Sequence, residues 1–383
     1  MKYLLTPEAE REIASRYEET VALLKELCQI PAPSNHEEKR AAWIKDWLEN
    51  LGAQGVYIDE ALNVVYPVNC ENRNDIVVFM AHTDTVFPDT EPMPMKEENG
   101  RLYCPGVGDD TANVAVLLTT VKYIIEKKLR PACGMLFVLN SGEEGLGNLK
   151  GCRQLMKDYE GRVASVISLD GGMTRYCNKS VGSHRYLVEI KTEGGHSYGS
   201  FGNRNAIAVM SNLINALYSV KVPVDGDSKT TYNVGTVSGG TSVNTIAQRA
   251  AMLYEYRSDS KVCIDKMEKM FYSLIDAYRN MGVEIDVRVL GKRPCMGVVD
   301  PRAQEALEER FSTIMAAYNG GIVPKAGSGS TDCNIPFSMG IPSICFGGYS
   351  GSGAHTREES IELKSLIPGL KIVTASVLSY FRG

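Results

Sequence analysis

The sequence predicts an α/β protein with a central, mostly parallel sheet and a smaller inserted α+β domain. Apolar runs at 75–81, 133–139 and 163–169 alternate with helical segments, which is typical of strands buried on both faces of a parallel sheet. Each of these runs is followed by acidic or imidazole side chains. From about 181 to 293 the pattern changes to β-α-β-β-α-β, the order of a ferredoxin-like domain.

The chain of 383 residues is longer than one ordinary core needs. We therefore expect one domain over 1–180 and 294–383, interrupted by a second domain over 181–293. The net charge is -5 and no basic block occurs, so we expect no nucleic-acid partner. No apolar run approaches the ~20 residues of a membrane helix, so we expect no membrane partner either. The N-terminus does not resemble a signal peptide and the ten cysteines form no CxxC pair, which predicts a cytoplasmic protein with reduced thiols.

The first helix is expected over 7–29, with Thr6 as its N-cap and Pro7 in its first turn. The elements expected next are a helix at 36–51 that ends at Gly52, strands near 55–59, 63–68 and 75–81, and a loop at 86–108 with a hairpin-like stretch at 98–103. The first domain then continues with helices at 112–127 and 149–158 and strands at 133–139 and 163–169.

The inserted domain is expected to contain strands at 184–192, 231–238, 249–257 and 283–290 and helices at 203–219 and 260–280. After it we expect a helix at 301–318, a glycine- and serine-rich loop at 327–330, a strand at 341–346 and a helix at 360–380.

Seven polar residues fall at the ends of predicted strands, at a helix start or in a glycine-rich loop: His82, Asp84, Asp109, Glu143, Glu144, Asp170 and His355. Ligands of an open α/β sheet bind at the carboxyl ends of its strands, so we expect these side chains at one edge. Ordinary alternatives exist, because Asp109 could cap a helix and Asp170 could open a tight turn. Glu143 and Glu144 could form a solvated loop, and His355 could be an exposed loop residue. The coincidence of all seven at one predicted edge favours a metal site.

This mixture of imidazoles and carboxylates suits zinc, and also manganese or cobalt. Two histidines and three carboxylates can hold two metal ions if one carboxylate bridges them, and paired metals can activate one water. In an adjacent Glu-Glu pair, one residue can bind metal while the other acts as general base.

The sequence resembles the M20 family of metallopeptidases. The matching stretches, in the family's order, are Ala81-His-Thr-Asp-Thr-Val86, Gly106-Val-Gly-Asp-Asp110, Ser141-Gly-Glu-Glu-Gly145, Leu169-Asp-Gly171, Gly195-His-Ser197 and Gly353-Ala-His-Thr356. The resemblance implies a zinc-peptidase-type catalytic domain and an inserted lid or dimerisation domain.

The resemblance also implies roles for individual residues. His82 and Asp170 would bind the first metal, with Asp84 orienting His82. Glu143 would be the general base. The metal-binding residues would together be His82, Asp109 as the bridge, Glu144, Asp170 and His355.

His196, in the inserted domain, matches a residue that stabilises the developing oxyanion in the partner subunit's active site. The expected substrate-binding residues are Asn244, Arg257, Gly329 and Ser330. Asn244 and Arg257 could equally support the fold, whereas Gly329 and Ser330 match the family's glycine-rich substrate loop. Two departures from the family pattern affect the substrate pocket: Thr111 stands where many relatives have lysine, and the stretch after His196 lacks the usual proline.

The sequence thus predicts a two-metal hydrolase that cleaves an amide bond in di- or tripeptides, with aminopeptidase-like action, a metal-bridging water and Glu143 as general base. Zn2+ is the first expectation, with Co2+ and Mn2+ open because ligand type does not separate them. An N-acyl amino acid deacylase, a desuccinylase or a carboxypeptidase of the same family is the alternative within enzymes. An inactive metal- or peptide-binding relative is the alternative outside them. A homodimer formed through the inserted domain is the expected assembly.

Overall fold

The structure, a computed structural model, describes residues 3–381. It divides into two compact units. The α/β unit contains the chain up to Lys179 and again from Val298, and the inserted unit is Ser180–Gly297. Residues 1, 2, 382 and 383, which the expected domain bounds include, lie outside the described part.

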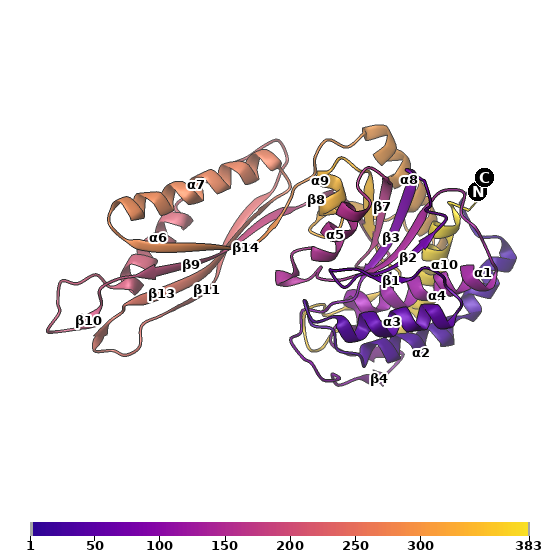
Figure 1. The fold of residues 1–383 in the computed structure, drawn as a ribbon, viewed down its shortest axis with the longest axis horizontal. Coiled ribbons are helices and arrows are strands. Elements are labelled where there is room, and N and C mark those ends of the chain that lie inside the picture. The colour runs from indigo at the N-terminus through magenta and orange to yellow at the C-terminus, as the bar shows by residue number, and fades with distance from the viewer. Residues whose placement is uncertain (1–2, 382–383) are drawn as a thin grey trace. The chain divides into compact units, whose positions relative to one another are not determined.

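An eight-stranded mixed sheet forms the centre of the α/β unit, which confirms the predicted class (Figure 1). Its strands in spatial order are β1 (Tyr57–Ile58), β2 (Val64–Val68), β6 (Met135–Asn140), β3 (Ile76–His82), β7 (Val163–Leu169), β16 (Ser343–Phe346), β8 (Arg175–Ser180) and β15 (Lys325–Gly329). The four central strands, β6, β3, β7 and β16, pair in parallel. The strands β1, β2 and β8 pair antiparallel to their neighbours, so the parallel character is limited to the centre.

Strand β3 is buried along its whole length, as its unbroken apolar run predicts. Its alternate residues enter two different cores. Val77, Phe79 and Ala81 pack into the larger cluster on one face of the sheet. Ile76, Val78 and Met80 pack into the smaller cluster on the other. The apolar run of β3 ends at His82, which is the last residue of the strand and its first polar side chain.

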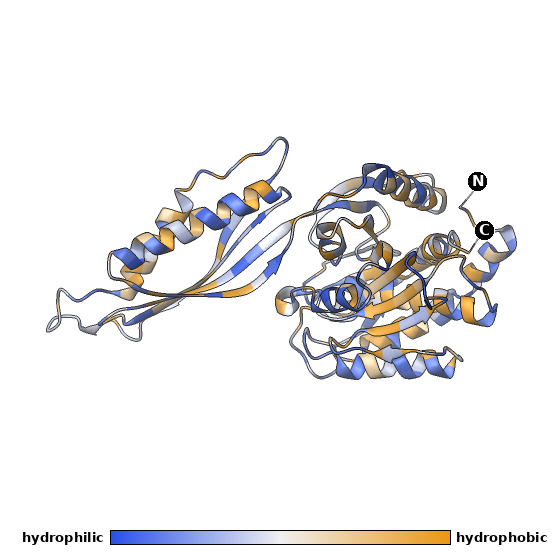
Figure 2. Ribbon diagram, turned by 45° about the horizontal axis from the view of Figure 1, so that its top comes forward, coloured by the Kyte–Doolittle hydropathy of each residue, from blue (hydrophilic) through white to orange (hydrophobic). Residues whose placement is uncertain are grey.

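Helices cover both faces of this sheet, with hydrophilic outer surfaces around the hydrophobic strands (Figure 2). Their bounds are α1 (Pro7–Ser15), α2 (Tyr17–Cys28), α3 (Glu38–Asn50), α4 (Asn113–Glu126), α5 (Lys150–Asp158), α8 (Pro301–Tyr318), α9 (Asn334–Ser338) and α10 (Leu366–Leu378). The larger cluster includes residues of α2, α3, α4, α8 and α10, and the smaller one includes residues of α5 and α9.

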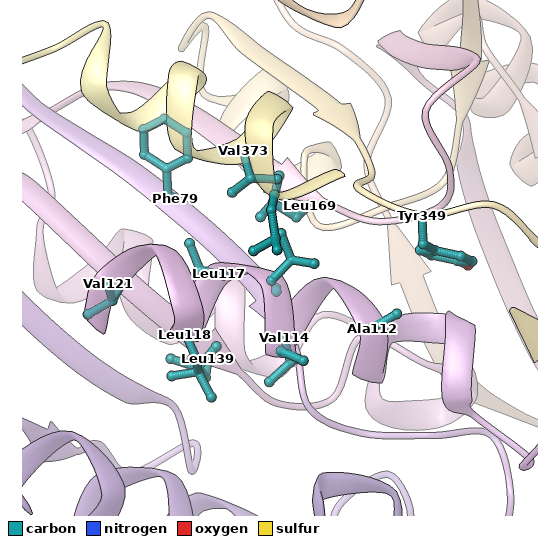
Figure 3. Close-up of a cluster of buried hydrophobic side chains, with 14 of the residues drawn as sticks. Phe79, Ala112, Val114, Leu117, Leu118, Val121, Leu139, Leu169, Tyr349 and Val373 are labelled. Atoms are coloured by element: carbon teal, nitrogen blue, oxygen red, sulfur yellow. The ribbon is translucent and has the colours of Figure 1, made fainter. Parts of the chain in front are cut away.

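Helix α4 is the most buried helix on the larger face and leads directly from the polar edge into the core (Figure 3). Most of its apolar side chains are buried, and Val114, Leu117 and Val121 are fully so. The adjoining ring of Phe79 meets Phe311 edge-on at 6.4 Å between centroids. This packing fixes the start of α4, and hence the loop before it, relative to the end of β3.

Three local expectations were wrong, one at the N-terminus and two after the insert. The helix expected over 7–29 breaks at Arg16, although Thr6 caps its start as predicted. The Arg16 guanidinium reaches Glu126 at 2.5 Å and lies 5.4 Å from the Tyr123 ring centroid, so contacts with α4 override the local helical preference.

The stretch 327–330, expected as a loop, lies largely in strand β15 at the edge of the sheet. The helix expected over 360–380 begins only at Leu366. The residues before it form β18 (Ser360–Glu362), which pairs with β5 (Arg101–Tyr103). Together with β4 (Lys96–Glu98) and β17 (Gly351–Ser352), they make a small antiparallel sheet. In both places strand pairing with distant segments wins over local composition.

The inserted unit has the expected β-α-β-β-α-β order. Its elements are β9 (Gly182–Lys191), α6 (Ala206–Tyr218), β11 (Thr230–Gly239), β13 (Arg249–Ser258), α7 (Lys261–Asn280) and β14 (Glu284–Arg293). The antiparallel sheet runs β11-β13-β9-β14, and its own core is separate from those of the α/β unit. A short ladder of β10 (Gly195–His196) with β12 (Thr245–Ile246) extends from it.

No helix within residues 3–381 is long and apolar enough to cross a membrane. All ten cysteines are free thiols, and eight of them are buried. Cys177 on β8 and Cys345 on β16 are direct cross-strand neighbours.

Candidate metal centre

The central parallel strands bring their polar ends to one edge of the sheet. His82, the last residue of β3, pairs with Asn140, the last residue of β6. The residue before it, Ala81, pairs with Leu169 on β7, so Asp170 follows immediately alongside. This placement is the one predicted from the strand ends.

Asp109 occupies the middle of the group. Its Oδ1 lies 3.0 Å from Nε2 of His82, and its Oδ2 lies 3.0 Å from Nε2 of His355. Nε2 of His355 also lies 3.0 Å from Oε1 of Glu144. One carboxylate therefore faces an imidazole with each of its oxygens, as a carboxylate shared by two cations does.

Three sets of side chains bring ligand atoms within 4.8 Å of one another. The sets are His82, Asp109 and Asp170; Asp109, Glu144 and His355; and His82, Glu143 and Glu144. The first two sets share Asp109 and together hold five residues, and the third set adds Glu143. The structure thus brings together six of the seven residues that the sequence singled out. The seventh, Asp84, lies directly behind them.

Asp84 is fully buried and holds the turn that carries the two glutamates. Its Oδ1 accepts the Glu143 N–H at 3.0 Å, and its Oδ2 accepts the Glu144 N–H at 3.0 Å and the Ser34 hydroxyl at 2.7 Å. Nδ1 of His82 lies 3.0 Å from the Asp84 carbonyl oxygen and 3.6 Å from its carboxylate. Burial opposes the charge of Asp84, but His82, Ser34 and the turn N–H groups outweigh it and lower its pKa.

The electrostatics of the edge call for positive charge. Burial, and then the negative charge of Asp109, raise the pKa of Asp170 to about 7. Hydrogen bonds to Asp109 and Glu144 raise the pKa of His355 to about 10. Burial opposes a charge on His82, yet the surrounding carboxylates raise its pKa well above the usual value. Where protons do not supply this charge, metal cations can.

Several supporting residues were missed by the sequence analysis. Buried Glu359 accepts the N–H groups of Gly106, Gly108 and Asp109, each at 2.8 Å. Buried Glu37 accepts the Gly142 N–H at 3.0 Å, next to the glutamate turn. No local sequence pattern distinguishes these acids from surface acids, because the N–H groups of Gly106, Gly108, Asp109 and Gly142 that they accept lie in distant loops.

Arg40 and Asp110 were missed for the same reason. Arg40 is buried, and its guanidinium donates to the carbonyl oxygens of Leu27, Ile30 and Thr83. Asp110 follows Asp109 through a cis peptide bond and accepts the His82 N–H at 3.1 Å.

Thr111, one of the two departures from the family pattern, is buried. Its hydroxyl donates to the Gly106 carbonyl at 2.6 Å and accepts from Arg40 at 3.4 Å. The side chain at this position therefore fastens the loop that carries Asp109.

In the inserted unit, the β10–β12 ladder brings the segments of His196 and Asn244 side by side, although they are far apart in the sequence. His196 pairs with Thr245, and the Ser197 N–H donates to the Asn244 carbonyl at 3.0 Å. His196 is exposed, and its Nδ1 accepts the N–H groups of Tyr198 and Gly199, both at 3.3 Å. Both of these hydrogen bonds are to Nδ1, and Nε2 takes part in neither of them.

The other expected substrate-binding residues lie in strands. Arg257 is on β13 and makes a two-bond contact with Glu255, at 3.0 and 3.1 Å. Gly329 ends β15 in the α/β unit, where a Cβ would stand 2.6 Å from the Cys177 sulfur, and Ser330 follows it.

A sequence profile of Peptidase family M20/M25/M40 matches residues 78–379, which is most of the chain and includes every residue of the metal-binding sets. The chain belongs to this peptidase family. It is accordingly a hydrolase of C–N bonds, and its fold is the one that the resemblance implies.

Individual relatives share little sequence identity with this chain. A succinyl-diaminopimelate desuccinylase of Corynebacterium glutamicum is 23% identical over 90% of this chain and 92% of its own. A tripeptidase structure from Staphylococcus aureus has a TM-score of 0.77 at 21% identity, covering 96% of this chain and 99% of that one. The Bacillus subtilis YXEP protein, described as a dinuclear metal-binding peptidase, has a TM-score of 0.63 at 14% identity, covering 96% of this chain and 99% of that one.

Proposed function

We propose that this family member is a two-metal hydrolase that cleaves a peptide or amide bond in small peptides. The observation that carries the proposal is the position of Asp109, whose two carboxylate oxygens each lie 3.0 Å from Nε2 of a different histidine. On each side a further carboxylate completes a mixed set, Asp170 with His82 and Glu144 with His355.

The chemistry of these donors fits a pair of divalent cations. Each set combines one imidazole nitrogen with carboxylate oxygens, the mixture that zinc, cobalt and manganese accept, and we favour Zn2+. Bound metals would lower the pKa of a water held between them and polarise the scissile carbonyl. His82 and Asp170 would hold the first ion, Glu144 and His355 the second, and Asp109 both.

Glu143 is the proposed general base. It is buried with its N–H held by Asp84, so its position is set by the scaffold. Glu144, its neighbour, contacts His355, whereas Glu143 belongs to neither of the two sets that share Asp109. Glu143 lies in the third set, with His82 and Glu144, and would take a proton from the attacking water and pass it to the leaving amine.

The inserted unit is the proposed lid. His196 would donate a hydrogen bond to the developing oxyanion from the partner subunit. Arg257 would bind a substrate carboxylate, since a planar guanidinium suits bidentate recognition. Its two hydrogen bonds to Glu255 fix the orientation of the guanidinium. Asn244, Gly329 and Ser330 would line the remainder of the substrate site.

Among substrates we favour di- or tripeptides, in keeping with the named activity of the Staphylococcus tripeptidase. An N-acyl amino acid is the second candidate, because the Corynebacterium relative is a desuccinylase. A panel of free dipeptides, tripeptides and N-acyl amino acids separates the two.

A homodimer through the inserted unit is also proposed. Strand β11 lies at one edge of the sheet in this unit, and a groove of about 410 Å³ between α6 and β11 is lined by Ile207 and Val237. Both side chains are substantially exposed, at 46% and 55%. An exposed strand edge beside apolar side chains suits pairing with a second copy. Light scattering should show a dimer. Val237→Lys should weaken this dimer, whereas the control Val262→Lys, on α7, should leave it intact. A monomeric wild type would contradict the proposal.

The central test combines metal content with one substitution. We expect about two equivalents of zinc, cobalt or manganese per chain, and we expect Glu143→Gln to keep the metals while losing hydrolysis. Full hydrolysis by Glu143→Gln would refute the mechanism. A wild-type protein that binds metal but cleaves none of the panel would favour an inactive binding relative.

A further inference from the structure

Glu359 is a buried acid that none of the assigned roles uses. It lies four residues after His355 and immediately before β18, and its side chain is 2% exposed. Its carboxylate accepts three backbone N–H groups from one loop. Oε2 accepts the N–H of Gly106, and Oε1 accepts those of Gly108 and Asp109, all at 2.8 Å.

These three bonds end on the loop that carries the shared carboxylate. The N–H of Asp109 itself is one of the three donors. The φ and ψ angles of Asp109 depart from helical values (-99° and 92°), so its backbone is not in a regular helical turn. The Glu359 carboxylate supplies the acceptor that a regular element would otherwise supply.

The backbone of Glu359 belongs to the loop that carries His355. Its N–H donates to the Thr356 carbonyl at 3.3 Å, and its carbonyl accepts the Cys104 N–H at 3.1 Å. Glu359 thus connects two segments far apart in sequence, one with Asp109 and one with His355. The pairing of β18 with β5 continues the same connection.

The space around these bonds is closely filled. A Cβ on Gly108 would lie 2.9 Å from the Tyr349 ring and 3.0 Å from Oε1 of Glu359. Tyr349 is itself buried and belongs to the same hydrophobic cluster as Ala112 and Val114 (Figure 3). The loop therefore has little room to take another position while Glu359 is present.

We propose that Glu359 is a positioning residue that sets the spacing of Asp109 and His355 and thereby the affinity for the second metal ion. This rests on the proposed function, in which Asp109, Glu144 and His355 hold that ion. The first ion depends less on Glu359, because His82 and Asp170 stand at the ends of the sheet strands β3 and β7. Substitution of residues that hold metal ligands in place typically weakens metal binding by about 10- to 100-fold.

Glu359→Gln is the sharpest substitution because it preserves the volume of the side chain. The amide retains one oxygen, which can serve either Gly106 or the pair Gly108 and Asp109. Its NH2 group then faces an N–H donor on the other side. The neighbouring exposed residue Glu358 offers a matched control, since Glu358→Gln removes the same charge one position away.

The experiment is a calorimetric titration of the metal-free full-length protein with Zn2+, and separately with Co2+, whose absorption reports coordination. Wild type and Glu358→Gln should bind two ions. Glu359→Gln should bind the second about 10- to 100-fold more weakly and the first within about threefold of wild type. Activity should return as free metal is raised, with an unchanged KM for the peptide, which a general loss of folding would not allow.

Glu359→Asp keeps both oxygens but shortens their reach, and it carries the test if Glu359→Gln does not fold. Unchanged affinity for the second ion in Glu359→Gln, or in Glu359→Asp when only that variant folds, overturns the proposal. An equal loss at both ions also overturns it. A wild type that binds fewer than two ions contradicts the proposed function instead, so the two failures are distinguishable.

Discussion

Asp84→Asn tests whether the carboxylate behind the metal-binding residues positions the general base. In the structure this carboxylate accepts the N–H groups of Glu143 and Glu144, each at 3.0 Å, and the Ser34 hydroxyl at 2.7 Å. Asparagine has nearly the same shape but a single acceptor oxygen. The two N–H groups lie on different carboxylate oxygens, so one of them must lose its acceptor and face an NH2 group.

The expected magnitude follows from these contacts. A hydrogen bond to a charged group contributes about 1.5–3 kcal/mol, and the site is fully buried, so water cannot replace the lost acceptor. At about 1.4 kcal/mol per tenfold change in rate, kcat/KM should fall by about 10- to 150-fold if the whole cost falls on the reacting geometry. His82→Ala should cost more, because it removes a ligand atom.

The assay is kcat/KM for a tripeptide at saturating metal, together with urea unfolding to separate activity from stability. Ser34→Ala is the control, because it removes one donor to Asp84 and leaves both turn N–H bonds intact. Its effect should stay below about tenfold. If Asp84→Asn keeps activity within threefold of wild type, or if Ser34→Ala costs as much, Asp84 does not act by holding the glutamate turn.

Three further predictions concern the loop of Asp109, the metals and the inserted unit. Gly108→Ala should lower activity and metal affinity, since its Cβ would stand 2.9 Å from Tyr349; wild-type metal binding would show that the loop can shift. Removing metal with a chelator should lower the melting temperature by several degrees, because two ions each present at 100 times their Kd stabilise the fold by about 2.7 kcal/mol apiece. An unchanged melting temperature in scanning calorimetry would exclude metal-linked stability. Burial lowers the pKa of His184 despite nearby Glu268, so its neutral form contributes stability above about pH 6.5 that is lost as the pH falls below that value. His184→Gln should remove up to about 1.4 kcal/mol per pH unit of this slope in urea unfolding, and identical slopes would contradict the assignment.

The general plan of the α/β unit could be predicted because it depends on short-range patterns. The apolar run before His82 is sufficient to identify a strand buried on both faces, and its polar end is sufficient to locate the functional edge. The same reasoning located Asp170 after β7 and the two glutamates after β6.

The residues that hold this edge together could not be predicted in that way. Glu359 and Glu37 bind backbone N–H groups of loops far away in the sequence, and an isolated glutamate gives no sign of such a partner. The end of the first helix at Arg16 and the strand at 325–329 depend in the same manner on long-range contacts.

The insertion of Ser180–Gly297 between β7 and β16 has a consequence for biosynthesis. These two strands are neighbours in the sheet, so the sheet cannot be completed until the ribosome has made the whole insert and the chain up to the end of β16. His355 and Glu359 are made later still. A nascent chain can therefore present the four segments that carry His82, Asp109, Glu144 and Asp170 long before His355 is made, and pairing of such distant segments is slow. Capture of the second ion would then mark the completion of folding, and the timing of metal uptake would report on the last step of the chain's assembly.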